Sequence, residues 1–153
     1  MEKLNGYIRK ILLTAGLIEI AVGLLHFIMP KATYQSKGYS GLNSFELDFV
    51  TLVILAVGIL LITFGSLTIY FSQRLEAVSE IILFYVTLKS LLWIGRVALE
   101  LMYPIKLNMF TIEPFTAIVL PGLVFEMLLF ILSAVLIRKS QLLGPPKRKS
   151  VKY

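Results

Sequence analysis

The chain has 153 residues, of which 58% are hydrophobic and 16% charged, and its mean hydropathy is +0.85. Soluble domains contain about 45–50% apolar and about 25% charged residues, so a water-soluble core of this size has no room for so much apolar surface. The composition therefore predicts one small polytopic membrane domain. The absence of cysteine excludes disulfides, thiolate chemistry and cysteine-ligated metal or iron–sulfur sites.

The net charge of +6 does not indicate a nucleic-acid-binding protein, because the largest basic cluster follows closely after an apolar segment. We expect a basic cytoplasmic tail over residues 140–153, with Lys147, Arg148, Lys149 and Lys152 as its cluster. Such clusters anchor the topology or contact anionic lipid headgroups. The expected partner is thus the lipid bilayer and not a nucleic acid.

The first expected span covers residues 11–29, and Pro30 should end it because proline disfavours continuation of a helix. The basic residues before this run resemble the start of a secretory signal. However, the run contains Glu19 and His26, and no small-residue cleavage site closes it, so we expect a retained span. The polar stretch 31–47 should form a short lid or an interfacial segment.

The second span, residues 49–71, has no charge between the flanking Asp48 and Arg74. Small residues recur along it every seven positions, at Thr51, Gly58, Gly65 and Ser72. Such a stripe lets a neighbouring helix approach closely, so its expected role is packing. The same stripe, through Gly58 and Gly65, could also support a homo-oligomer.

The third span, residues 77–103, places four polar or aromatic residues on one stripe, at steps of four, three and four: Lys89, Trp93, Arg96 and Glu100. The fourth span, residues 115–137, carries Glu126 near its middle and Pro121, which should kink it. The expected fold is an all-α, antiparallel four-helix bundle integral to the membrane.

The flanking Lys and Arg residues predict the orientation. Ten lie on one side, namely Lys3, Arg9, Lys10, Arg74, Arg138, Lys139, Lys147, Arg148, Lys149 and Lys152. Three lie on the other, namely Lys31, Lys37 and Lys106. We therefore expect both termini in the cytoplasm and the protein in the plasma membrane.

This topology places the ionisable residues in depth. At about 1.5 Å per residue from the cytoplasmic edge, Glu19 lies at about 13 Å, Glu126 at about 18 Å and Lys89 at about 19 Å. Each lone charge there would cost at least about 2.5–3.5 kcal/mol. We therefore expect these three side chains to face inward and approach one another. A second group should line a polar cavity open to the outer side and roofed by residues 31–47: His26, Arg96, Glu100, and Asp48 or Glu46.

Two interpretations of the buried charges stay open. As a functional site, Glu19, His26 and Glu126 would be acid–base groups, and Lys89, Trp93, Arg96 and Glu100 would bind a ligand. As a structural feature, the ion pairs would fix helix register. Arg96 and Glu100 could instead reach lipid headgroups.

The residue inventory excludes several chemistries. One histidine, no cysteine and scattered carboxylates do not form a zinc set, and the two Glu-x-x-His motifs of a di-iron bundle are absent. No P-loop, Rossmann glycine fingerprint or G-x-S-x-G motif occurs. We expect no metal, and whether the protein is an enzyme remains open.

Two groups of residues carry a family resemblance. Gly23-Leu24-Leu25-His26-Phe27, followed by Pro30 and Tyr34, resembles the opening of DoxX-like small membrane proteins. Gly95-Arg96, followed by Pro104, Pro121 and Glu126, resembles a related four-helix group of unknown function. The resemblance implies the fold and topology. Since some DoxX-like members are associated with quinone-linked sulfur oxidation, it also implies a quinone as a cofactor to test, without assigning its binding residues.

The leading hypothesis is thus an intramembrane polar pocket that binds or acts on a small lipophilic molecule, such as a quinone or lipid. One alternative is an accessory or structural subunit of a larger membrane complex, for instance a respiratory one. Another is a proton-coupled carrier.

Overall fold

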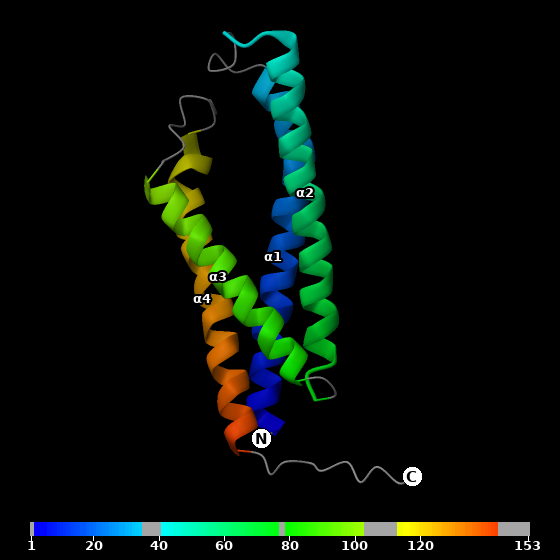
Figure 1. Ribbon diagram of the computed structural model, residues 1–153, viewed down its shortest axis with the longest axis vertical. Helices are drawn as coiled ribbons and strands as arrows, with labels where there is room; N and C mark the ends of the chain where they lie inside the picture. The colour runs from blue at the N-terminus through cyan, green and yellow to red at the C-terminus, as the bar shows by residue number, and fades with distance from the viewer. Residues whose placement is uncertain (1, 35–40, 77–78, 103–112, 144–153) are drawn as a thin grey trace.

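The computed structural model describes residues 2–34, 41–76, 79–102 and 113–143, and this part of the chain is all-α (Figure 1). Its helices are α1 (Glu2–Tyr34), α2 (Ser44–Gln73), α3 (Ser79–Met102) and α4 (Glu113–Leu143). Consecutive helices run in opposite directions, and all four are long and apolar enough to cross a membrane. The expected all-α, antiparallel four-helix architecture is confirmed, and the protein has the features of a four-span membrane protein.

The expectation that Pro30 ends the first helix is wrong. Helix α1 continues through Pro30 to Tyr34, and α4 likewise contains Pro121. Proline removes one backbone donor, but the turns before and after it keep their hydrogen bonds, and long membrane helices tolerate such a single loss. Pro30 is also buried, so packing holds the helix there.

Two further helix ends lie outside the expected apolar runs. Helix α2 begins at Ser44 because Asn43 and Glu46 form a capping box, with hydrogen bonds of 3.0 Å from the Glu46 N–H and 2.8 Å to the Glu46 carboxylate. Helix α4 continues to Leu143, so the expected tail over 140–153 starts as helix. Residues 144–153, 103–112 and 35–40 lie outside the described residues, and with them the basic cluster of the tail and the middle of the expected lid, whose two ends belong to α1 and α2.

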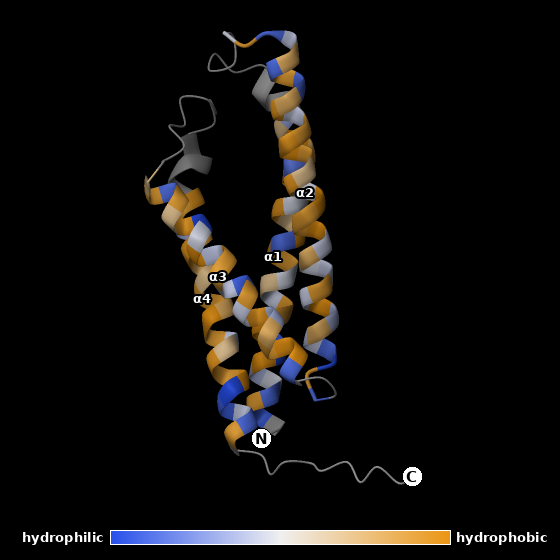
Figure 2. Cartoon of the chain, viewed as in Figure 1, coloured by the Kyte–Doolittle hydropathy of each residue, from blue (hydrophilic) through white to orange (hydrophobic). Residues whose placement is uncertain are grey.

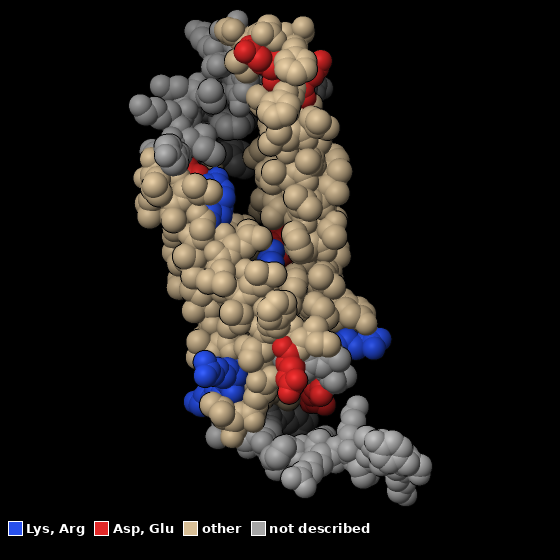
Figure 3. Space-filling view, in the orientation of Figure 1, with Lys and Arg blue, Asp and Glu red and all other residues tan. Residues whose placement is uncertain are grey.

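The helices form two pairs. Helix α1 packs along α2, α3 packs along α4, and α1 also contacts α4 (Figure 1). The pairs meet at the end of the molecule where α1 begins and α4 ends, which we call the closed end. They diverge toward the opposite end, the open end, where the space-filling view shows a gap between them (Figure 3).

Glycines bring α1 and α2 into direct backbone contact. A Cβ atom added at Gly16 would lie 2.7 Å from the Gly65 carbonyl oxygen, and one added at Gly23 would lie 2.8 Å from that of Gly58. The small-residue stripe of α2 therefore serves packing, as expected, and its partner is α1 of the same chain. Because α1 covers Gly58 and Gly65, the stripe is occupied within the chain, and a homo-oligomer stays a prediction.

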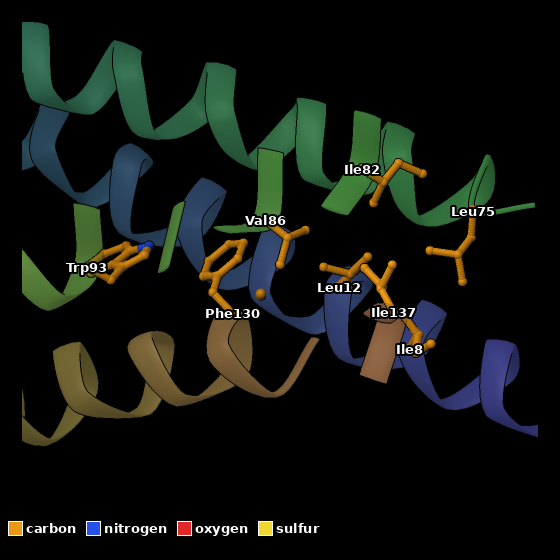
Figure 4. Close-up of a cluster of buried hydrophobic side chains, with 9 residues drawn as sticks. Ile8, Leu12, Leu75, Ile82, Val86, Trp93, Phe130 and Ile137 are labelled. Carbon is orange, nitrogen blue, oxygen red and sulfur yellow. The ribbon is translucent and has the colours of Figure 1, made fainter. Parts of the chain in front are cut away.

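An apolar core fills the closed end (Figure 4). It is built from α1, α3, α4 and the residue that follows the end of α2, and its main members are Ile8, Leu12, Leu75, Ile82, Val86, Phe130 and Ile137. Below it, Asn5 accepts a 3.0 Å hydrogen bond from Ser140 and donates one of 3.5 Å to Glu76. This end of the bundle is thus held by both apolar packing and polar contacts.

The outward faces of the helices are apolar as well (Figure 2). Only 6% of the most apolar window of α2 is buried in the protein, and large side chains such as Leu52, Phe84 and Val135 are exposed. Contiguous apolar surface of this extent is unfavourable in water. The lipid bilayer is the solvent that such a surface fits.

Candidate functional site

The most unusual feature of the bundle is a buried ion pair between Glu19 of α1 and Lys89 of α3. The same oxygen of Glu19 accepts a 3.2 Å hydrogen bond from the indole Nε1 of Trp93. The second oxygen lies 3.4 Å from the Thr68 hydroxyl of α2, which donates to it. Two helices, α2 and α3, therefore contribute partners to one carboxylate of α1, and both of its oxygens have a partner.

Aromatic rings surround the ammonium group of Lys89. Its Nζ lies 4.8 Å from the ring centre of Phe64, 5.2 Å from that of Phe130 and 5.7 Å from that of Trp93. At these distances the negative faces of the rings attract a cation. Because Phe64 belongs to α2 and Phe130 to α4, all four helices meet at Lys89.

A second carboxyl group, that of Glu126 on α4, lies beside this pair without a partner. Its residue is only 4% exposed, and neither carboxylate oxygen has a hydrogen-bond partner among the described residues. It is close enough to Glu19 and Lys89 to interact electrostatically with both. We call Glu19, Lys89 and Glu126 the charge cluster. The structure thus pairs Glu19 with Lys89 and buries Glu126 within electrostatic range of both, whereas a direct contact of Glu126 with the pair stays a prediction.

The charge cluster sits directly on the open-end side of the apolar core. On α1 the core residues precede Glu19, on α3 Ile82 and Val86 precede Lys89, and on α4 Phe130 and Ile137 follow Glu126. Trp93 is the core residue that lies on the other side of Lys89. Figure 3 shows acidic and basic atoms at the inner end of the gap between the helix pairs. The cluster therefore marks the boundary between the packed half of the bundle and the divergent half.

Two hydroxyl groups of the site were missed by sequence reasoning. The hydroxyl groups of Thr68 and Tyr85 lie 2.8 Å apart, and Tyr85 also lies 2.9 Å from the Phe64 carbonyl oxygen, to which it can donate. The Thr68 hydroxyl also lies 2.8 Å from the Phe64 carbonyl oxygen, and each of the two hydroxyl groups has a single proton. Thr68 can therefore donate to Glu19 when Tyr85 donates either to the Phe64 carbonyl or to Thr68. The available signals were spacings: Thr68 follows Gly65 by three residues, and Tyr85 precedes Lys89 by four.

Arg96 and Glu100 form a separate ion pair along α3, with 2.7 Å between their charged atoms. Lying seven residues beyond Lys89, Arg96 is about 10 Å further toward the open end. The Glu100 side chain is buried, whereas that of Arg96 is 35% exposed. This pair is therefore distinct from the charge cluster.

His26 contacts its own helix. Its Nδ1 lies 2.8 Å from the Val22 carbonyl oxygen, so Nδ1 carries a proton and donates it, and its Cβ packs near Gly58. The structure thus places His26 against α2. Glu46, the other residue considered for the outer group, is part of the capping box of α2. The acid–base roles of Glu19, His26 and Glu126 stay predictions.

The arrangement holds two carboxyl groups, one ammonium and an indole N–H in an apolar, aromatic environment, which suits a polar ligand end better than a metal. Over the described ranges, no three His, Cys, Asp or Glu side chains gather closely enough to hold a metal ion. Comparisons with protein-family models, with curated proteins and with solved structures gave no match to this chain, so the candidate site is defined by its geometry alone.

Proposed function

We propose that the protein binds a small lipophilic molecule, quinone-like or lipid-like, between its two helix pairs, with the polar end of the molecule at the charge cluster. The observation that carries this proposal is the buried carboxyl group of Glu126, which has no hydrogen-bond partner among the described residues. A buried polar group without a partner is costly, and a ligand that hydrogen-bonds to it would offset that cost. The apolar walls would hold the rest of the molecule.

Trp93 makes this proposal directly testable, because it is the only tryptophan of the chain and donates to Glu19. We expect a decyl-substituted benzoquinone, titrated into the purified protein, to quench Trp93 fluorescence in a saturable manner. The control is the double variant Trp93→Phe, Leu92→Trp, since Leu92 is exposed on the neighbouring lipid-facing position. That variant should show only unsaturable quenching from partition into lipid. Equal, unsaturable quenching of both proteins would exclude a quinone as the bound molecule.

A second function is favoured by one observation. Both oxygens of Glu19 already have partners on two other helices, as in an ion pair that fixes the register of helices. On this interpretation the protein is an accessory subunit of a larger membrane complex and binds no small molecule. Purification of a stable larger complex, together with the absence of ligand-dependent Trp93 quenching, would support this second function.

We further propose that both termini face the cytoplasm, on the basis of the asymmetry in flanking Lys and Arg. The chain has no cysteine, so a thiol reagent labels only a cysteine that is introduced by substitution. Gly6 near the closed end and Gly41 near the open end each have space for a side chain. In intact cells, a membrane-impermeant maleimide should label Gly41→Cys and leave Gly6→Cys unlabelled until the membrane is opened. The reverse pattern would invert the topology.

A further inference from the structure

We propose that the ligand is a lipophilic amine whose ammonium group pairs with Glu126. This inference rests on the proposed function and specifies the chemistry of the polar end. Glu126 has two acceptor oxygens without a hydrogen-bond partner in the described part of the chain, and the residue is only 4% exposed. The group that completes this site must donate hydrogen bonds.

The charge balance of the cluster favours a cationic donor. Lys89 supplies one positive charge, and it is in direct contact with Glu19, whose two oxygens are both occupied. A second ionised carboxyl group at Glu126 leaves one uncompensated negative charge in an apolar environment, which is strongly unfavourable. A proton on Glu126 restores neutrality, but it leaves the carboxyl group without a hydrogen-bond partner, whereas an ammonium group supplies both the charge and the donors.

The surroundings favour an organic ammonium over an inorganic ion. The rings of Phe64, Trp93 and Phe130 already hold the ammonium group of Lys89, so this environment is compatible with alkylated nitrogen cations. Sodium and divalent cations instead require several oxygen ligands. The described residues offer no cluster of three metal-binding side chains.

The same count of charges and hydrogen-bond donors predicts the order in which other lipophilic molecules bind. An alcohol donates one hydrogen bond and carries no charge, so it satisfies only one acceptor of Glu126 and leaves its charge uncompensated. A benzoquinone brings only carbonyl acceptors, and leaves an ionised Glu126 unpaired. Decylamine, 1-decanol and a decyl-substituted benzoquinone share their alkyl chain and differ at the polar end, so they separate these contributions.

The test is the affinity of the purified protein for these three compounds near neutral pH, measured by Trp93 fluorescence, with sodium chloride as the inorganic control. We expect decylamine to bind at least about tenfold more tightly than 1-decanol, equivalent to about 1.4 kcal/mol. Glu126→Gln should reduce this preference to about one, because it removes the charge while keeping the shape. Glu80→Gln, the same substitution at an exposed site at the start of α3, should preserve the preference.

A folding readout separates loss of the site from loss of structure. Glu126→Gln removes an uncompensated buried charge, so without ligand this variant should unfold at the same or a higher temperature than the unmodified protein. Equal affinity for decylamine and 1-decanol, or an amine preference that survives in Glu126→Gln, would overturn the inference while the proposed function stands. If none of the three compounds binds saturably, the proposed function itself is wrong.

Discussion

Replacing Lys89 with methionine is expected to destabilise the protein by about 3–5 kcal/mol, because it leaves a buried carboxylate without its counter-ion. Glu19 would keep its hydrogen bonds from Trp93 and Thr68, but these do not neutralise its charge. Methionine has a similar volume, so loss of packing contributes little. Unfolding by denaturant in detergent, followed by Trp93 fluorescence, measures the change in the free energy of unfolding.

A double variant tests this explanation, because it also removes the unpaired charge of Glu19. The double variant Lys89→Met, Glu19→Gln should recover most of the lost stability, since replacing both members of a buried ion pair is often neutral. Lys10→Met, at an exposed lysine of α1, is the matched control and should change little. A double variant as unstable as Lys89→Met alone would show that the ion pair is not the source of the effect.

The second large effect is expected at the contact between α1 and α2. Gly16→Val and Gly65→Val should each destabilise the protein by about 3 kcal/mol, the upper end of the usual cost of overpacking. A Cβ atom at either position would lie 2.7 Å from a backbone carbonyl oxygen of the other helix. Backbone is unable to move aside as a flexible side chain would, so the helices must separate.

Gly95→Ala and Gly122→Ala provide the matched controls, because an added Cβ atom meets nothing within 4 Å at either position. Alanine favours helix over glycine by up to about 1 kcal/mol, so these variants should be neutral or slightly more stable. Thermal unfolding of the four variants in one detergent gives the comparison. Similar behaviour at the buried and open glycines would contradict the close helix contact.

The sequence was most informative where one helix carries a periodic pattern. The seven-residue spacing of Gly58 and Gly65 indicated a packing stripe. The spacing of Lys89, Trp93, Arg96 and Glu100 indicated one stripe of α3, in which the structure buries every residue but Arg96. Both inferences need only the geometry of a single helix. The helix that packs on this stripe could not be predicted in the same way, because Gly16 and Gly23 face the stripe only once α1 and α2 cross.

The charge cluster was likewise predictable where single helices define it, and not where helices cross. Depth counted along each helix predicted that Glu19, Lys89 and Glu126 would meet, and the ion pair between Glu19 and Lys89 is present. The hydroxyl groups of Thr68 and Tyr85 were missed, because threonine and tyrosine are common in apolar helices and their pairing depends on the crossing of α2 and α3. The continuation of α1 through Pro30 was missed because a local rule about proline takes no account of tertiary packing.

The closed end has a mechanical consequence for the whole bundle. There, Asn5 links α1 to Ser140 of α4 and to Glu76 between α2 and α3, directly below the apolar core. Any change in the angle between the two helix pairs is therefore a rotation about this end. Such a rotation displaces each residue in proportion to its distance from the pivot, so Glu100 travels further than Lys89. The ion pair between Glu19 and Lys89 joins the two helix pairs between the pivot and the open end, so it opposes any such widening.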